Sequence, residues 1–127
     1  MAYEAVEVGK KFVNQSASNL HDHYGDMSPV HSLNNLAVVI WAFLSFQDSF
    51  DEAIGETICC GWDTDCTGAT VGGLIGLDKG SIPESWTDPW QGRVNTAIAG
   101  VGELKLEDLV ERTCKLVDQF SSESDMD

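Results

Sequence analysis

The amino-acid sequence predicts an all-α fold, in which several helices pack orthogonally into a compact bundle. Near both ends of the chain, over Tyr3–Leu20 and Leu106–Phe120, apolar residues recur mostly at helical intervals. Between these segments, the run Leu36–Leu44 is apolar on nearly every side, as in a helix that other helices enclose. No segment shows the alternation of apolar and polar residues that is typical of a half-buried strand.

The composition is that of one folded domain. A chain of 127 residues, of which 43% are hydrophobic, is long enough for one core and too short for two ordinary domains. The formal net charge of -14, from 7 basic and 21 acidic residues, disfavours nucleic acid as a partner, because phosphate binding relies on Lys and Arg. We therefore expect a single helical domain over residues 1–120 and a flexible acidic tail over residues 121–127.

The first half of the chain predicts two helices separated by a loop. Tyr3–Leu20 forms the first, and Gly25-Asp26-Met27-Ser28-Pro29 then supplies turn residues, since the residue before Pro is pushed out of the helical region. The second helix is expected over Asn35–Phe46. The same apolar run also fits a buried strand, but its 12 residues favour a helix, because buried strands usually last about 4 to 8 residues.

A capping box and a glycine-rich segment predict the next two helices. In Ser49-Phe50-Asp51-Glu52, the Ser49 side chain can accept from the N–H of Glu52 while Glu52 reaches back, so a helix should begin here and end near Cys60. Asp63 or Asp65 can then cap a helix over residues 66–77. Each of its four glycines weakens a helix by about 1 kcal/mol relative to Ala. Close approach of neighbouring backbones is the expected compensation.

The remaining segments predict an irregular connection and a last helix. Ser81–Gly92 holds two prolines and two tryptophans and is expected to be irregular. Leu106–Phe120 carries the apolar stripe of an amphipathic helix. The longest apolar run has 9 residues, whereas a membrane-spanning helix needs roughly 20, so no membrane partner is expected.

The four cysteines are expected to be reduced thiols in a cytoplasmic protein. The chain shows no secretory signal, exceeds the usual size of a disulfide scaffold, and has two adjacent cysteines. A structural zinc site is not expected, because Cys59, Cys60 and Cys66 with His21 or His23 lack paired cysteine spacing.

The segment Gly61–Gly68 is the one place where residues suited to chemistry converge. Asp63 and Asp65 lie two apart at a turn entering a helix, and both carboxylates can point toward one hard cation such as Mg²⁺ or Ca²⁺. The other interpretation is that both are capping or solvated residues. An EF-hand loop that starts at Asp63 fails, because its twelfth position is Leu74 rather than Glu.

A phosphotransferase is a remote alternative. The string Asp63–Thr67 resembles the nucleophile motif of haloacid-dehalogenase-type phosphotransferases, in which an aspartate is phosphorylated beside Mg²⁺. That motif belongs at the end of a buried parallel strand, whereas the capping box at Ser49 predicts a helix before it.

Longer stretches of the chain resemble the C-terminal part of ADP-ribosylglycohydrolase family proteins. The matching stretches are Asn34-Asn35, Phe50-Asp51-Glu52-Ala53-Ile54, Gly61–Gly72, Ile82–Pro89 and Arg93-Val94. The most specific of them is Gly61-Trp62-Asp63-Thr64-Asp65-Cys66 with the glycine-rich helix that follows. The likeness covers roughly residues 25–94.

The resemblance implies a helical domain that holds two Mg²⁺ or Mn²⁺ ions and hydrolyses the bond between ADP-ribose and a protein side chain. The metal ligands of the family carry over to Asp63 and Asp65, and Trp62 beside them is a candidate contact for ADP-ribose. The next family position is commonly Thr or Ser and is Cys66 here, a soft ligand poorly matched to Mg²⁺.

The resemblance also implies that part of the family site is missing. Family members carry an earlier Thr-Asp-Asp-type run, and this chain has no adjacent Asp-Asp pair. We therefore expect a partial ADP-ribosylglycohydrolase fold, from a fragment or a degenerate relative, whose catalytic site is incomplete in this chain alone. The alternative function is a non-catalytic association module. Its partners would be the missing N-terminal half or a second copy of the chain, through apolar surface left exposed.

Overall fold

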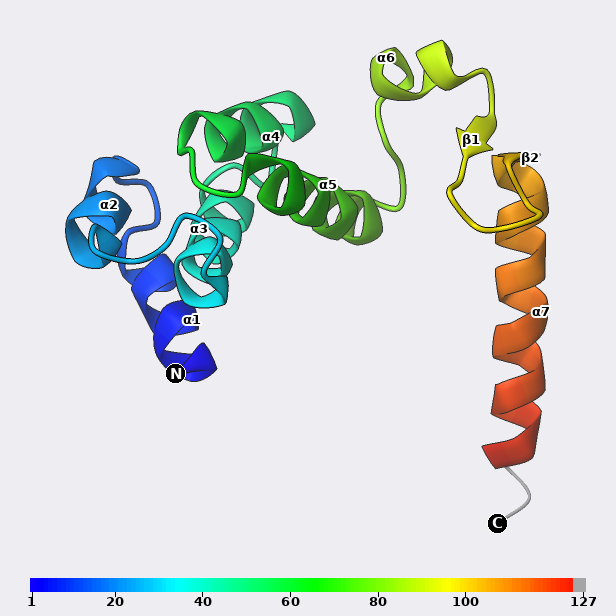
Figure 1. The fold of residues 1–127 in the computed structure, drawn as a ribbon, viewed down its shortest axis with the longest axis horizontal. Helices are drawn as coiled ribbons and strands as arrows, with labels where there is room; N and C mark the ends of the chain where they lie inside the picture. The colour runs from blue at the N-terminus through cyan, green and yellow to red at the C-terminus, as the bar shows by residue number, and fades with distance from the viewer. Residues whose placement is uncertain (125–127) are drawn as a thin grey trace. The chain divides into compact units, whose positions relative to one another are not determined.

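The computed structural model of the protein describes the backbone of residues 1–124 and the side chains of residues 1–121. The described residues form an all-α fold with seven α-helices, one 3-10 turn and two short strands (Figure 1). The chain divides into two compact units, Met1–Ile82 and the part from Pro83 onward, and each is described by itself. The prediction of one domain over residues 1–120 stays a prediction.

The first unit begins with two short helices in place of the single helix predicted over Tyr3–Leu20. They are α1 (Ala2–Lys11) and α2 (Ser18–Tyr24). The prediction was wrong because Asn14 adopts a positive φ of 59°, which an α-helix does not accommodate. Tertiary contacts hold this break: the N–H of Asn14 donates to Ser45 Oγ at 3.0 Å, and Trp41 Nε1 donates to the Gln15 carbonyl at 3.1 Å.

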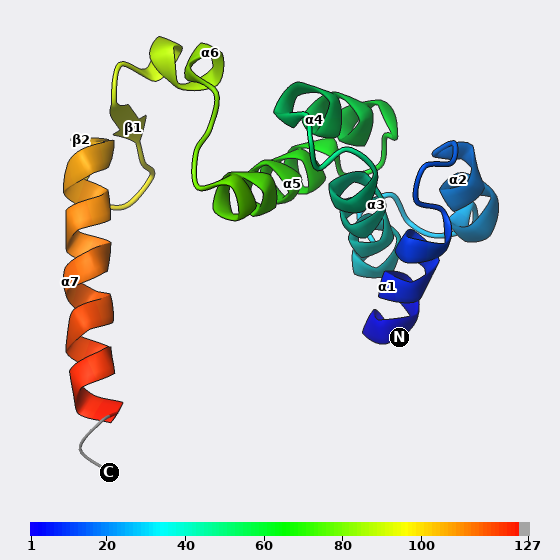
Figure 2. The same cartoon turned by 180° about the vertical axis from the view of Figure 1, so that it is seen from behind.

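Helix α3 (Ser32–Ser45) lies at the centre of the first unit and contacts α1, α2, α4 and α5 (Figure 2). It starts three residues before the predicted Asn35, because the His31 ring caps it: Nδ1 accepts from the N–H of Leu33 at 3.2 Å. Trp41 is only 1% exposed, in agreement with an enclosed helix. Helix α1 approaches α3 closely at Gly9, where an added Cβ would lie 2.7 Å from the Ala37 carbonyl oxygen.

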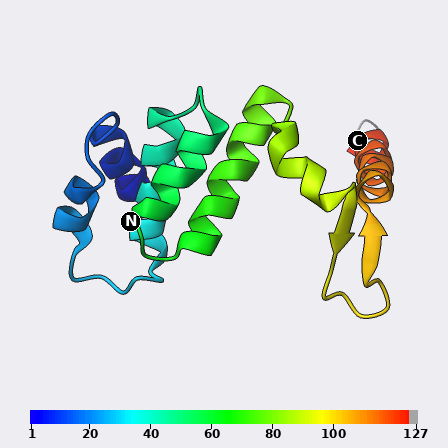
Figure 3. The same ribbon diagram turned by 90° about the horizontal axis from the view of Figure 1, so that it is seen from above.

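Helices α4 (Phe50–Cys59) and α5 (Thr64–Lys79) run side by side (Figure 3). The predicted cap of α4 is confirmed, since Ser49 Oγ accepts from the N–H of Glu52 at 3.3 Å. The N–H of Ser49 instead donates to the Phe46 carbonyl at 3.0 Å, so it is satisfied without the reciprocal half of the capping box. Helix α5 is longer than the predicted range of 66–77 by two residues at each end.

Three of the four glycines of α5 admit side chains of neighbouring segments rather than a neighbouring backbone, and Gly73 has no neighbouring atom within 4 Å. A Cβ added at Gly72 would lie 3.2 Å from Cδ1 of Ile54, and one added at Gly68 would lie 3.4 Å from Cγ1 of Ile58. The expected close approach of neighbouring backbones was therefore wrong, because the neighbours are side chains, mainly of isoleucine. The fit lets α4 and α5 pack closely around the turn that joins them.

The second unit contains the elements α6 (Glu84–Thr87), η1 (Asp88–Trp90), β1 (Arg93–Asn95), β2 (Glu103–Lys105) and α7 (Leu106–Ser124). Strands β1 and β2 form an antiparallel hairpin in which Val94 faces Leu104 (Figure 3). The sequence analysis predicted no strand, because segments of three residues are too short to show a period of two. The predicted irregular connection proves to be partly helical, in α6 and η1.

Helix α7 extends the predicted last helix by four residues to Ser124. Residues 121–124, which were predicted to belong to a tail, are therefore helical, and residues 125–127 of that prediction lie outside the described residues. Several apolar side chains of α7 are exposed, among them Val117 at 58% and Phe120 at 69%. Within residues 1–124, no helix is both long and apolar enough to cross a membrane.

Candidate metal centre

The candidate site is built on the turn between α4 and α5. After the last residue of α4, Gly61 and Trp62 both adopt left-handed backbone conformations, with φ of 82° and 60°. The chain then turns through Asp63, the N-cap residue of α5, which begins at Thr64. This tight reversal places Asp63, Asp65 and Cys66 together on the first turn of α5.

Aromatic contacts hold Trp62 in its unusual backbone conformation. A left-handed conformation costs a non-glycine residue roughly 1–2 kcal/mol, so neighbouring groups must favour it. The Trp62 ring packs on His21 with ring centroids 4.2 Å apart, and on the edge of Tyr24 at 6.5 Å. His21 Nε2 also donates to the Cys60 carbonyl at 2.6 Å, so α2 contacts both sides of the turn.

Two polar side chains form hydrogen bonds with the backbone of Asp63. The N–H of Asp63 donates to Asn35 Oδ1 at 3.2 Å, and Asn35 Nδ2 donates in turn to the carbonyls of Pro29 and His31 at 2.8 and 2.9 Å. On the other side, the buried Thr67 donates its hydroxyl to the Asp63 carbonyl at 2.9 Å. The carboxylate of Asp63 does not cap a backbone N–H of α5. Its partner is the thiol of Cys66.

Asp63, Asp65 and Cys66 form a cluster of three potential metal ligands. Each contributes one ligand atom, and these atoms all lie within 4.8 Å of one another. Asp63 is half-buried, whereas Asp65 and Cys66 are exposed. A hydrogen bond with Asp63 raises the pKa of the Cys66 thiol, as do the negative charges of Asp63 and Asp65.

The other sulfur and imidazole groups do not join this cluster. Cys60 is only 4% exposed, and burial raises its pKa to about 11, so it stays a neutral thiol at pH 7. All four cysteines are free thiols, as predicted. His31 is a hydrogen-bonded structural residue at the start of α3.

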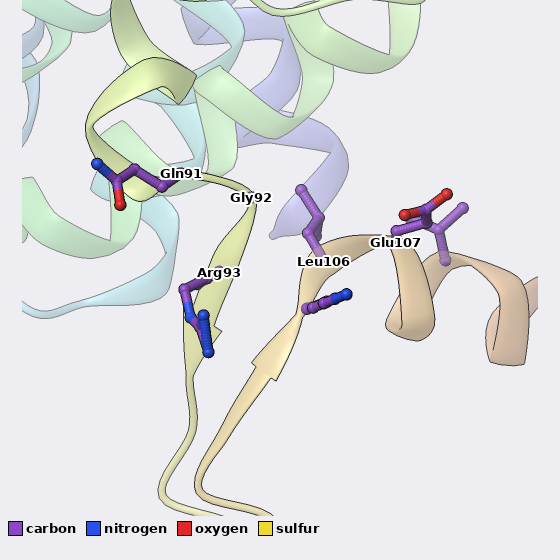
Figure 4. Close-up of a pocket in the computed structure, with 7 residues that line it drawn as sticks. Gln91, Gly92, Arg93, Leu106 and Glu107 are labelled. Atoms are coloured by element: carbon purple, nitrogen blue, oxygen red, sulfur yellow. The ribbon is translucent and has the colours of Figure 1, made fainter.

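A separate pocket lies in the second unit. It has a volume of about 600 Å³, and its lining includes Arg93, Lys105 and Glu107 (Figure 4). None of the sequence-predicted site residues lines it. In the candidate metal centre at the start of α5, Asp65 and Cys66 are exposed.

Comparison with known proteins identifies the family to which this turn and its two helices belong. A family model described as ADP-ribosylglycohydrolase matches residues 2–124. The chain belongs to the ADP-ribosylglycohydrolase family. The match extends beyond residues 25–94, to which the resemblance in the sequence was confined, and includes both compact units. No curated protein and no solved structure matches the chain.

Membership of the ADP-ribosylglycohydrolase family agrees with the all-α fold and removes the phosphotransferase alternative. Asp63 follows helix α4 and precedes helix α5, whereas the phosphotransferase motif requires a buried parallel strand before its aspartate. The family is generally metal-dependent, and Asp63 belongs to the cluster of potential metal ligands.

The cluster fits a divalent cation. Metal–oxygen bonds of about 2.0–2.2 Å and metal–sulfur bonds of about 2.3 Å place two ligand atoms at most about 4.5 Å apart across one ion. The observed spread of up to 4.8 Å exceeds this value by a few tenths of an ångström, which exposed side chains can close by rotation. The two carboxylates suit a hard cation, and the thiol suits a softer one.

Two residues of the site were not predicted as part of it. Asn35 was noted only as part of the family resemblance, and His21 was treated as a candidate ligand of an improbable zinc site. The sequence did offer a signal for Asn35, which is a polar residue at the start of an otherwise apolar helix. A buried amide at such a position needs hydrogen-bond partners. Nothing in the sequence indicates that His21 packs on Trp62, a residue 41 positions later.

Proposed function

We propose that this chain carries the Asp-x-Asp metal-binding segment of an enzyme that hydrolyses the glycosidic bond between ADP-ribose and a protein side chain. The observation that supports this most directly is the convergence of Asp63, Asp65 and Cys66 within 4.8 Å in a chain of this family. Asp63 and Asp65 would hold Mg²⁺ or Mn²⁺, and Cys66 occupies the position of the family's Thr or Ser ligand. ADP-ribose or an ADP-ribosylated protein would be the partner.

The bound ions would orient the ribose hydroxyls and polarise the attacking water, as in other metal-assisted hydrolases. The residues of the chain would prepare this site before substrate arrives. Asn35 and Thr67 fix the backbone of Asp63, so its carboxylate loses little conformational freedom when it binds a cation. Trp62 uses one side of its ring on His21 and is only half-buried, and we assign its remaining surface to ADP-ribose.

Catalysis in this proposal needs more ligands than the described cluster offers. Each Mg²⁺ takes about six ligands, while the cluster offers three, and the chain has no adjacent Asp-Asp pair. The remaining acidic ligands would come from another segment or another polypeptide. The chain alone would then bind an ion and ADP-ribose more readily than it turns over substrate.

A non-catalytic association module is the second candidate. The exposed apolar side chains of α7, among them Leu116, Val117 and Phe120, favour it, because large exposed apolar patches often mark interaction surfaces. The two candidates differ in one measurement. Release of ADP-ribose from a modified protein by the purified chain alone contradicts the association module. If the chain binds ions but releases no ADP-ribose, the result supports the association module.

Calorimetric titration of Mn²⁺ and of ADP-ribose tests the binding half of the proposal. We expect Asp63→Asn and Asp65→Asn each to weaken Mn²⁺ binding by about tenfold or more, because each removes a charged oxygen ligand. Asp78→Asn is the matched control, since it removes the same charge from the other end of α5, where Asp78 forms only an exposed ion pair with Lys79. Equal Mn²⁺ affinity of the wild type and both site variants would refute the proposal.

A further inference from the structure

We propose that the pocket of the second unit, where the hairpin meets the start of α7, binds a small phosphate monoester that also carries hydroxyl groups. Arg93 and Lys105 bind the phosphate, and Glu107 accepts hydrogen bonds from the hydroxyls. The proposal does not rest on the proposed function, because no residue of this pocket belongs to the ligand cluster at the start of α5.

The pocket has the size and the lining of a small-molecule site. Its volume of about 600 Å³ lies within the range of roughly 300–1,000 Å³ that is typical of ligand pockets. Figure 4 shows Arg93 on β1 at one side and Leu106 and Glu107 at the start of α7 at the other. Leu106 and Val110 supply apolar surface beside the charged groups. All the lining residues belong to the second unit, so the pocket is complete within it.

The register of the hairpin holds the two cations of the pocket side by side. Arg93 of β1 lies directly opposite Lys105 of β2. The N–H of Leu106 donates to the Gly92 carbonyl at 2.8 Å, so Arg93 and Lys105 form the adjacent pair that exchanges no backbone hydrogen bond. In such a pair the Cβ atoms are about 4.5–5.5 Å apart and both side chains leave the same face of the hairpin.

Two like charges directly opposite each other weaken a hairpin, and an anion between them would offset their repulsion. Glu103 accepts from Arg93 at 2.8 Å, but this bond uses Nε and leaves the terminal Nη groups of the guanidinium for a ligand. Among the side chains that the structure describes, none forms an ion pair with Lys105. The chain places two of its 7 basic residues in this pocket, which makes it suited to an anion.

Phosphate matches this pair of cations better than a carboxylate does. A phosphate monoester carries about −1.5 to −2 charges at pH 7 and three acceptor oxygens, whereas a carboxylate carries one charge. The planar guanidinium of Arg93 can bind two phosphate oxygens at once, and Lys105 adds a compact charge. The pocket also includes the first residues of α7, a helix of 19 residues, and the dipole of a helix favours an anion at this end.

Glu107 restricts which phosphate compounds fit. It lines the pocket, and its carboxylate accepts hydrogen bonds from hydroxyls but repels a second phosphate group. Two cations and one carboxylate leave the lining with a single net positive charge, which is too little for a polyphosphate or a nucleic acid. The lining therefore favours a monophosphate whose hydroxyls reach Glu107.

Calorimetric titration of the full chain with glucose 6-phosphate, inorganic phosphate and glucose tests the pocket. We expect glucose 6-phosphate to bind more tightly than inorganic phosphate and glucose to show no binding. Lys105→Gln and Arg93→Gln should each weaken binding of both phosphates by about tenfold or more, because each removes a charged hydrogen-bond donor. Equal affinity of Lys105→Gln and the wild type, or a wild type that binds neither phosphate, overturns the proposal.

Matched variants separate loss of a ligand contact from loss of structure. Lys115→Gln and Arg112→Gln remove the same charges from positions of α7 outside the pocket and should leave the affinity unchanged. Glu103→Gln removes the ion pair of Arg93 without altering the lining, and we expect it to retain phosphate binding. If Lys115→Gln weakens binding as much as Lys105→Gln does, the phosphate responds to net charge alone and the proposal is wrong.

Glu107→Gln tests the second half of the proposal. We expect this variant to bind inorganic phosphate about two- to fivefold more tightly, because a repelling charge is removed. Its preference for glucose 6-phosphate over inorganic phosphate should decrease, because the amide accepts hydrogen bonds from hydroxyls more weakly than the carboxylate does. An unchanged preference would contradict the role given to Glu107.

Discussion

Asn35 controls the position of Asp63 although it is not a candidate ligand itself. Its side-chain oxygen accepts from the N–H of Asp63, and its amide nitrogen donates to two carbonyls of the loop before α3. Asn35 is 9% exposed, so its side-chain amide has little access to water. One side chain therefore ties the start of α3 to the start of α5.

We predict that Asn35→Ala lowers the free energy of unfolding by about 1–3 kcal/mol, because it removes three hydrogen bonds to partly buried backbone groups. It should also weaken Mn²⁺ binding, since Asp63 loses its backbone anchor. Urea denaturation and calorimetric titration measure the two effects. Asn19→Ala removes an exposed amide that bonds Gln15 and is the control. An Asn35→Ala protein as stable as Asn19→Ala would show that this anchor contributes little.

Single residues also mark how far the site could be predicted. Asp63, Asp65 and Cys66 were proposed together from spacing and resemblance, and the structure brings their ligand atoms together. The positive φ of Trp62 and its contact with His21 were not predicted, because they depend on how α2 packs on the turn. Local spacing could indicate the ligands, whereas the residues that support them come from distant segments.

At the scale of secondary structure, the turn between α4 and α5 requires a glycine at position 61 because of its backbone conformation and not because a side chain would clash there. A Cβ added at Gly61 meets no atom within 4 Å, yet the φ of 82° there is unfavourable for any residue with a side chain. Gly73 offers a comparison, because it is equally open but lies inside α5.

We predict opposite effects for alanine at these two glycines. Gly61→Ala should lower the free energy of unfolding by about 1–2 kcal/mol, because alanine strains in a left-handed conformation. Gly73→Ala should raise it by about 0.5–1 kcal/mol, because alanine is the better helix former. Thermal and urea denaturation of both variants measures this. Stabilisation by Gly61→Ala would show that the turn does not need its left-handed conformation.

The helices themselves were predictable where local signals were strong. The Ser49 cap marked the start of α4, because a side-chain oxygen and the N–H of Glu52 lie within one turn. The break between α1 and α2 was missed, because it depends on contacts of Asn14 and Gln15 with α3. The hairpin was missed because its strands pair through only three residues each.

At the scale of the whole molecule, the buried apolar core belongs to the first unit. Within the residues whose side chains are described, every buried apolar side chain lies between Ala5 and Ile75. In the second unit, α7 presents its apolar residues to solvent. Hydrophobic burial is the main favourable contribution to folding, so the two units differ in the source of their stability.

We predict that a fragment of residues 1–82 unfolds cooperatively and keeps Mn²⁺ binding, because it contains the core and the ligand cluster. A fragment of residues 83–127 should lack a cooperative transition, because its hairpin and helix enclose little apolar surface. Circular dichroism during heating distinguishes the two. Failure of the first fragment to fold would instead support the single domain over residues 1–120 that the composition predicts.

The hydrogen bond between Asn35 and Asp63 joins groups 28 residues apart. Asp63 therefore has this backbone anchor only when α3 is docked against α5. By mass action, a cation that binds only this folded arrangement adds to stability in proportion to the logarithm of its concentration, once that concentration exceeds the dissociation constant. The divalent-ion content of the surroundings would then help to set how much of this protein is folded, independently of any substrate.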